Sequence, residues 1–168
     1  MAGHHSTWPK VHSLANLLPK YKFVVFLDAD ATFRHLGLPL EWLFTRWSIT
    51  PRTSFAMARD PWDEGQNLCD SHGVPMVNTG FIIAQNLELT HRIFETWMRC
   101  TSGELGQGEW EGGYWENTEG ESRGKDGYRK SYRDCGKWKT KWAHEQSVFS
   151  EYLRRDFNPE GDNIVVSP

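Results

Sequence analysis

The sequence predicts an α/β domain with a mostly parallel sheet, flanked by helices and interrupted by a long irregular insertion. Segments with apolar residues at helical spacing alternate with short, almost wholly apolar runs, and this alternation is typical of α/β proteins. Such runs favour strands that are covered on both faces, as in parallel sheets. The chain has 168 residues, about the size of one domain. We therefore expect residues 1–168 to form a single domain, and an incomplete one, because it begins at a helix and ends within a strand.

The first half of the chain predicts two helices and two strands. An amphipathic helix is expected over residues 8–18, with Thr7 as its N-cap, because apolar side chains recur there at helical spacing. Its apolar stripe consists of Trp8, Val11, Leu14, Ala15 and Leu18. Residues 22–27 (KFVVFL) are almost wholly apolar and predict a strand covered on both faces. Residues 39–46 predict a short helix, and residues 54–58 a second strand.

The second half predicts two further strands and two further helices. Residues 60–75 form a polar loop, residues 79–84 (TGFIIA) the third strand, and residues 163–166 (NIVV) the last strand. Each helix follows from an apolar stripe at helical spacing. The stripes consist of Ile93, Phe94, Trp97 and Met98 in the first helix, and of Val148, Phe149, Tyr152 and Leu153 in the second.

Residues 102–137 differ from the rest of the chain. They are rich in Gly, Glu, Trp, Tyr and Arg and show no periodicity, and so long an irregular segment is unusual inside a compact domain. We expect a mobile, low-complexity insertion here. A functional lid and an insertion without function, including translated non-coding sequence, both agree with this composition.

Composition excludes several classes of protein. Lys and Arg number 19 against 22 Asp and Glu, a net charge of −3, so the chain lacks the positive field that binds nucleic acid. It has no apolar run of about 18 residues, and its start lacks the features of a signal peptide. The three cysteines, Cys69, Cys100 and Cys135, are too far apart to predict a zinc site or a disulfide framework.

Asp28 and Asp30 directly follow the first predicted strand. They therefore lie at the carboxyl edge of the sheet, where open α/β folds bind their ligands. Two carboxylates held about 4 Å apart repel each other, and a divalent cation reverses that repulsion. Oxygen ligands favour Mn²⁺ or Mg²⁺, and these ions in turn favour a substrate that carries phosphates. The alternative is a pair of turn or capping carboxylates.

Three blocks of the sequence together resemble a known family. They run from Trp8 to Asp30 (WPKVHSLANLLPKYKFVVFLDAD), from Val77 to Gln85 (VNTGFIIAQ) and from Trp142 to Phe149 (WAHEQSVF). In order and spacing they are similar to GT-A-fold nucleotide-diphospho-sugar glycosyltransferases of the fungal galactosyltransferase and mannan-polymerase-subunit type. The resemblance implies a partial GT-A fold, Rossmann-like and truncated at both ends. It also implies transfer of a hexose from a nucleotide-diphospho-sugar to a glycan or glycoprotein acceptor, with retention of anomeric configuration.

The same resemblance assigns roles to individual residues. It gives Asp28 and Asp30 to a Mn²⁺ ion, with Mg²⁺ as the alternative, that bridges the donor diphosphate. It places the segment Asn78, Thr79 and Gly80 in the donor-sugar and acceptor pocket, although an ordinary turn also favours Asn and Gly. It makes Glu145 and Gln146 the residues that position the sugar as the diphosphate leaves. A carboxylate at a helix start is also favoured by the helix dipole alone.

Further expectations come from the resemblance. The metal-binding histidine of the family lies beyond the C-terminal end of this chain, so His144 is a weaker candidate. Trp110, Tyr114 and Trp115 of the insertion could stack on sugar rings or be exposed aromatic residues without a role. Family members are held in the Golgi by an N-terminal anchor, which this chain lacks.

Two other functions compete with the transferase. Val25 to Phe33 (VFLDADATF) also resembles the opening strand of haloacid-dehalogenase-type phosphatases, in which Asp28 would be the nucleophile and Asp30 the general acid. Ala31 stands where that family usually has glycine, and the later acidic pair of that family is not found. The second competitor is an inactive, truncated relative or a partner subunit of the transferase.

Overall fold

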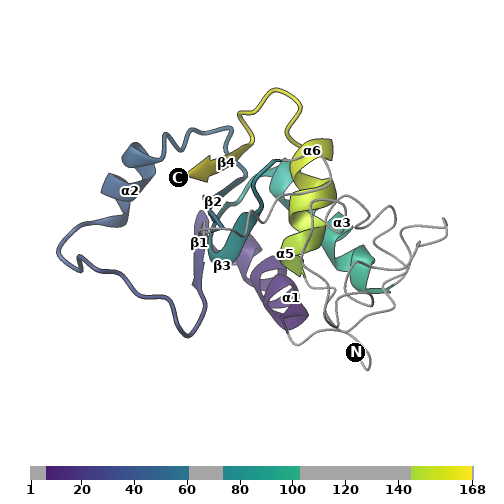
Figure 1. The fold of residues 1–168 in the computed structure, drawn as a ribbon, viewed down its shortest axis with the longest axis horizontal. Helices are drawn as coiled ribbons and strands as arrows, with labels where there is room; N and C mark the ends of the chain where they lie inside the picture. Colours follow the sequence, from purple (N-terminus) through teal and green to yellow (C-terminus); the bar gives the residue numbers. More distant parts are fainter. Residues whose placement is uncertain (1–6, 61–73, 103–144, 168) are drawn as a thin grey trace, which may run out of the picture.

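The structure is a computed structural model that describes residues 7–60, 74–102 and 145–167. Four strands form one sheet, and most of the helices pack together on one side of it (Figure 1). Most of the expected insertion at 102–137 lies outside the described residues, as do His144, Cys69 and Cys135. Within the described ranges, no helix has the length and apolar character needed to cross a membrane.

The sheet is mixed. Its strands are β1 (Phe23–Leu27), β2 (Phe55–Arg59), β3 (Val77–Gln85) and β4 (Ile164–Ser167), in the order β1-β3-β2-β4. β3 pairs antiparallel with both β1 and β2, whereas β2 and β4 are parallel. The α/β class is thus confirmed, but the expectation of a mostly parallel sheet is wrong. An apolar run reports that a strand is buried and does not report its direction.

β1, β2 and β4 nevertheless point the same way, because β3 alone is reversed between β1 and β2. Their carboxyl ends therefore share one edge of the sheet with the start of β3. β1 is an edge strand of the described sheet, as β4 is on the other side, and each residue of β1 is only half-buried. Full cover on both faces was expected for this strand, and its edge position explains the difference.

A bulge in β3 interrupts its pairing with β2. Met57 is opposite Ile82, but the next residue of β2, Ala58, is opposite Asn78. Residues 79–81 of β3 therefore have no partner in β2. Bulges of this kind bend a strand and redirect its side chains, and they are frequent next to functional sites.

One face of the sheet carries the hydrophobic core. Helices α1 (Trp8–Leu17) and α3 (Glu88–Ser102) pack over it, together with the helix that begins at Glu145. The fully buried aromatic side chains include Phe55, Phe94, Trp97 and Phe149. The rings of Trp97 and Phe149 lie 4.7 Å apart, and those of Phe55 and Phe94 5.0 Å apart. We call this side the packed face.

The last helix is continuous but irregular. It consists of α5 (Glu145–Val148), a π-helical turn (Phe149–Leu153) and α6 (Arg154–Asp156). Together with the elements described above, this helix confirms the predicted helices and strands, and their ends differ from the prediction by a few residues. A short 3-10 turn (Leu18–Lys20) extends α1 up to the break before β1.

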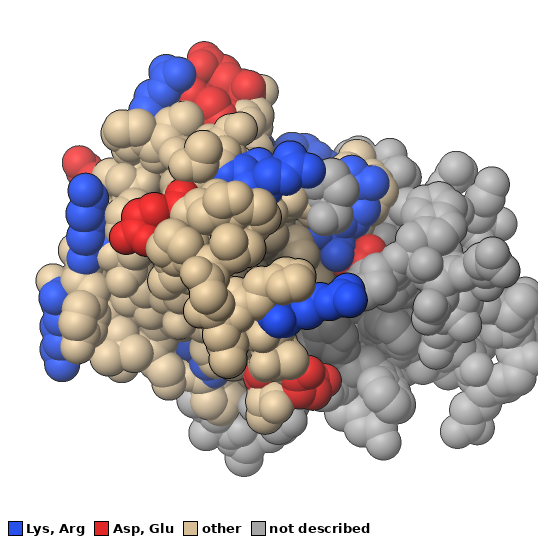
Figure 2. All heavy atoms as spheres, turned by 90° about the vertical axis from the view of Figure 1, so that its left-hand side faces the viewer, with Lys and Arg blue, Asp and Glu red and all other residues tan. Residues whose placement is uncertain are grey.

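The opposite face, which we call the thin face, is covered by the segment around α2 (Leu40–Arg46). Phe44 contacts Phe23 of β1, while Phe33 and Trp47 contact Phe81 of β3. α2 has no buried residue, and Trp42 is 49% exposed. On the side that carries α2, residues other than Lys, Arg, Asp and Glu make up most of the described surface, and charged residues of both signs are scattered across it (Figure 2).

An open hollow of about 690 Å³ separates α2 from β4. Trp42, Trp47 and Val165 are among the residues that line it. None of the residues that line this hollow belongs to the polar site described next.

Candidate functional site

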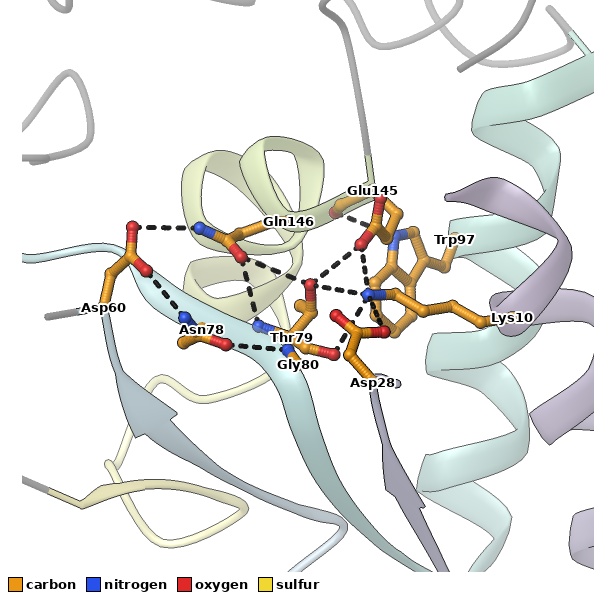
Figure 3. Close-up of polar contacts among 9 residues, drawn as sticks. All are labelled: Lys10, Asp28, Asp60, Asn78, Thr79, Gly80, Trp97, Glu145 and Gln146. Atoms are coloured by element: carbon orange, nitrogen blue, oxygen red, sulfur yellow. Dashed lines mark hydrogen bonds and ion pairs between the residues drawn. The ribbon is translucent and has the colours of Figure 1, made fainter. Parts of the chain in front are cut away.

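The carboxyl edge of the sheet gathers polar side chains from three strands (Figure 3). Asp28 directly follows β1 and Asp60 directly follows β2, and these two strands point the same way. Asn78, Thr79 and Gly80 lie in the first part of β3, which starts at this edge because β3 runs in the opposite direction. The position agrees with the general rule that α/β sheets bind ligands outside the carboxyl ends of their strands.

Lys10 of α1 enters this cluster from the packed face. Its Nζ atom lies 2.7 Å from Oε1 of Glu145 and 3.6 Å from Oδ1 of Asp28. The same ammonium donates to the carbonyl oxygen of Thr79 at 3.0 Å and to its Oγ1 at 3.2 Å. The Lys10 side chain is 9% exposed and that of Glu145 only 2%. Burying two such charges is costly, and their close contact and added hydrogen bonds offset that cost.

Thr79 and Trp97 fix Glu145 further. The Thr79 hydroxyl lies 2.8 Å from Oε1 of Glu145 and 3.3 Å from Oε1 of Gln146. Because a hydroxyl has one proton to donate, the shorter contact to the carboxylate is the stronger hydrogen bond. The indole N–H of Trp97 donates to the backbone carbonyl of Glu145 at 3.1 Å. Glu145 is therefore held at both its side chain and its backbone.

Gln146 and Asn78 hold Asp60 between them. Nε2 of Gln146 donates to Oδ2 of Asp60 at 3.0 Å, and Nδ2 of Asn78 donates to Oδ1 at 2.9 Å. The amide oxygen of Gln146 accepts the backbone N–H of Thr79 at 3.2 Å. Burial raises the pKa of the Asp60 carboxyl above its usual value, an effect larger than the lowering by its two hydrogen bonds.

Position 80 requires glycine because the side chains of Asn78 and Asp28 lie close to its Cα atom. A Cβ atom at this position would lie 2.8 Å from Oδ1 of Asn78 and 3.2 Å from Oδ2 of Asp28. The backbone N–H of Gly80 donates to Oδ1 of Asn78 at 2.7 Å, and its carbonyl accepts the N–H of Asp28 at 2.8 Å. The missing side chain thus leaves room for the Asp28 carboxylate beside the strand.

The structure brings together most of the residues that the sequence singles out. Six of them belong to one network of hydrogen bonds and ion pairs: Asp28, Asn78, Thr79, Gly80, Glu145 and Gln146. Asp30 lies in the turn after β1 with its side chain exposed, and in the described part of the chain no contact joins it to the network. The roles assigned to all seven residues stay predictions.

The residues at this edge suit a divalent cation that completes its coordination elsewhere. Asp28 and Asp30 supply carboxylate oxygens, which Mn²⁺ and Mg²⁺ favour. Asp28 is 41% exposed, and Gly80 leaves its carboxylate free of crowding. The described residues contain no group of three His, Cys, Asp or Glu side chains placed for a metal. A cation held by these two carboxylates could complete its coordination with water and substrate phosphates, as Mg²⁺ commonly does.

Sequence reasoning missed Lys10 and Asp60. Asp60 shares a detectable signal with Asp28, because each is the first residue after a strand and the two strands are parallel in direction. Lys10 has no such signal: it borders the apolar stripe of α1, where a lysine is usually solvated.

Comparisons of the chain with protein-family models, with curated protein sequences and with solved structures find no match. The functional argument therefore depends on the geometry of the network and on the three sequence blocks. These blocks contribute Lys10 and Asp28, then Asn78 to Gly80, then Glu145 and Gln146 to a single site.

Proposed function

We propose that this chain is part of a metal-dependent glycosyltransferase that moves a hexose from a nucleotide-diphospho-sugar to a glycan acceptor. The observation that supports this function best is the convergence of the three sequence blocks at the carboxyl edge. Thr79 contacts Lys10, Glu145 and Gln146 across 69, 66 and 67 residues of sequence, respectively. Local turn or capping preferences, the simpler explanation for each motif, do not require the motifs to meet.

The proposal gives each residue a task. Asp28 and Asp30 would hold Mn²⁺, or Mg²⁺, which when bound would offset negative charge on the donor diphosphate. Asn78 and Gly80 shape the surface beside Asp28, where the donor sugar would lie. Glu145 is nearly fully buried, so it acts as a positioning residue through Thr79 and Lys10. Gln146 orients Asp60, whose carboxylate can accept hydrogen bonds from sugar hydroxyls.

The remaining parts of the proposal come from the resemblance. They are the partial GT-A fold, retention of anomeric configuration, a fungal source and action on secretory-pathway glycans in the Golgi.

The proposal is tested by Mn²⁺ titration calorimetry with and without UDP or GDP. Wild-type protein is expected to bind Mn²⁺ weakly, and the nucleoside diphosphate is expected to tighten binding because its phosphates complete the coordination. Replacing both carboxylates, Asp28→Asn with Asp30→Asn, should abolish both effects. The exposed Asp156→Asn is the matched control and should change neither.

Two results would contradict this function. Mn²⁺ binding that survives the double substitution would remove the metal site. Hydrolysis of a simple phosphate monoester that Asp28→Asn abolishes would instead support the phosphatase, in which Asp28 is the nucleophile. Hydrolysis of UDP- or GDP-hexoses, measured with the same variants, then tests the transferase chemistry directly.

A further inference from the structure

The Lys10 ammonium lies between two carboxylates that differ in distance and in exposure (Figure 3). Its Nζ atom is 2.7 Å from Oε1 of Glu145, which is 2% exposed, and 3.6 Å from Oδ1 of Asp28, which is 41% exposed. The ion pair of Lys10 with Glu145 is therefore shorter and more buried than its ion pair with Asp28. Because ion pairs strengthen as water is excluded, Glu145 is the principal partner of Lys10.

The hydrogen bonds of the ammonium are already in use. A lysine ammonium has three N–H donors, and three acceptor atoms lie within hydrogen-bond distance: Oε1 of Glu145 and the carbonyl and hydroxyl oxygens of Thr79. Asp28, at 3.6 Å, is beyond that distance. Lys10 also lies 5.3 Å above the ring centre of Phe26, which further fixes its position. The Asp28 oxygens thus interact electrostatically with the Lys10 ammonium, but no hydrogen bond joins them to it.

We propose that Glu145 and Thr79 hold Lys10 back from Asp28, and that Lys10 is the positioning residue that sets the cation affinity of Asp28. This inference rests on the proposed function, because it concerns the same carboxylate. The positive charge of Lys10 opposes a second cation at Asp28. Glu145 limits this electrostatic repulsion by binding the ammonium, which leaves the Asp28 oxygens available to a cation.

The inference predicts opposite effects for the two partners of one ion pair. Lys10→Met removes the competing charge, so Asp28 should bind Mn²⁺ more tightly. Glu145→Gln removes the principal partner of the ammonium, which then moves toward Asp28 and competes with Mn²⁺. A purely structural role for the ion pair would weaken Mn²⁺ binding in both variants.

The experiment is titration of the full chain with Mn²⁺ alone, followed by calorimetry. Lys10→Met is expected to tighten binding roughly tenfold, from the Coulomb repulsion between charges about 5 Å apart in a water-like medium. Glu145→Gln is expected to weaken binding several-fold, and Lys10→Arg, which keeps the charge, should stay near wild type. Lys20→Met removes an exposed lysine elsewhere on the same segment and is the matched control without effect.

Circular dichroism verifies that each variant is folded. If Lys10→Met does not fold, Glu145→Gln and Lys10→Arg decide: weaker binding by the first and unchanged binding by the second support the inference. Unchanged or tighter binding by a folded Glu145→Gln overturns it, as does unchanged or weaker binding by a folded Lys10→Met.

The outcomes also separate this inference from the proposed function. Mn²⁺ binding that is lost on substitution of Asp28 and Asp30 but unchanged on substitution of Lys10 and Glu145 overturns the inference. Such a result still supports the metal site. Absence of Mn²⁺ binding in every variant, with and without nucleoside diphosphate, overturns both.

Discussion

The two faces of the sheet are covered to very different degrees. On the packed face, Phe55, Trp97 and Phe149 are at most 1% exposed and contact one another. On the thin face, α2 has no buried residue, and Leu36 and Trp42 are 85% and 49% exposed. The folding free energy gained from apolar burial is therefore concentrated on one side of the sheet.

This difference explains where the site obtains its rigid groups. Lys10 comes from α1 and Glu145 from α5, and both helices belong to the packed face. The α2 segment supplies none of the residues of the network drawn in Figure 3. A buried ion pair needs fixed, dry surroundings to offset the cost of desolvation, and the packed face provides them at the edge where the strands end.

The largest expected effect compares one aromatic residue from each face. Phe149→Ala on the packed face should lower the free energy of unfolding by about 3–5 kcal/mol, because it leaves a cavity among buried rings. Phe33→Ala on the thin face removes a ring that is 38% exposed, and should cost no more than about 1 kcal/mol. Urea unfolding measures both. Equal losses would show that the two faces contribute alike and would break the comparison.

The ion pair gives a second, smaller effect on the packed side. Lys10→Met removes the cation that lies 2.7 Å from the buried Glu145 carboxylate and should cost about 3 kcal/mol. Adding Glu145→Gln removes the negative charge of this buried side chain, so the double variant should recover most of that loss. A double-mutant cycle by urea unfolding measures the coupling energy. Additive losses would show that the two charges are not coupled and that the packed face does not strengthen their ion pair.

The smallest effect is a pH dependence at Asp60, at the carboxyl edge of the sheet. Burial raises the pKa of Asp60 in the folded chain, so the folded state keeps this proton to higher pH than the unfolded state. Stability from Asp60 is then fully present below its unfolded pKa and is lost as pH rises through its folded pKa. The Asp60→Asn variant has no carboxyl group to titrate at this position, so it should not lose this stability as the pH rises.

The free energy of unfolding of wild type and of Asp60→Asn is measured by urea unfolding at several pH values between about 4 and 7. Wild type should lose stability relative to the variant across this range. The difference isolates Asp60, because the two proteins are identical at every other position. A stability gap that stays constant with pH would contradict the raised pKa.

Local sequence patterns are sufficient to place the helices and strands. The stripe from Trp8 to Leu18 and the run at residues 22–27 each specify one element, because burial of a face imposes its own period. Strand direction is different in kind: β3 is reversed by the path of the chain between elements, which no periodicity records. For the same reason, the edge position of β1 could not be predicted.

The site was predictable where a motif follows a strand and hidden where a contact is long-range. Asp28 could be placed at the carboxyl edge from its sequence neighbours alone. The burial of Lys10 depends on Glu145, 135 positions later in the sequence, and on Thr79, 69 positions away. The bulge that presents Thr79 and Gly80 depends on the register with β2, which is also a property of the assembled sheet.

The long sequence separations within the network have a consequence for how the site forms. Its bonds connect residues 66, 69 and 86 positions apart, from Thr79 to Glu145, from Lys10 to Thr79 and from Asp60 to Gln146. Contacts of this span can form only after large loops have closed, which slows folding and carries an entropic cost. Each bond is lost when either of the two segments that it joins detaches, so the complete network requires all of these segments to be in place. The integrity of the network therefore reports the packing of α1 and α5 against the carboxyl edge formed by β1, β2 and β3.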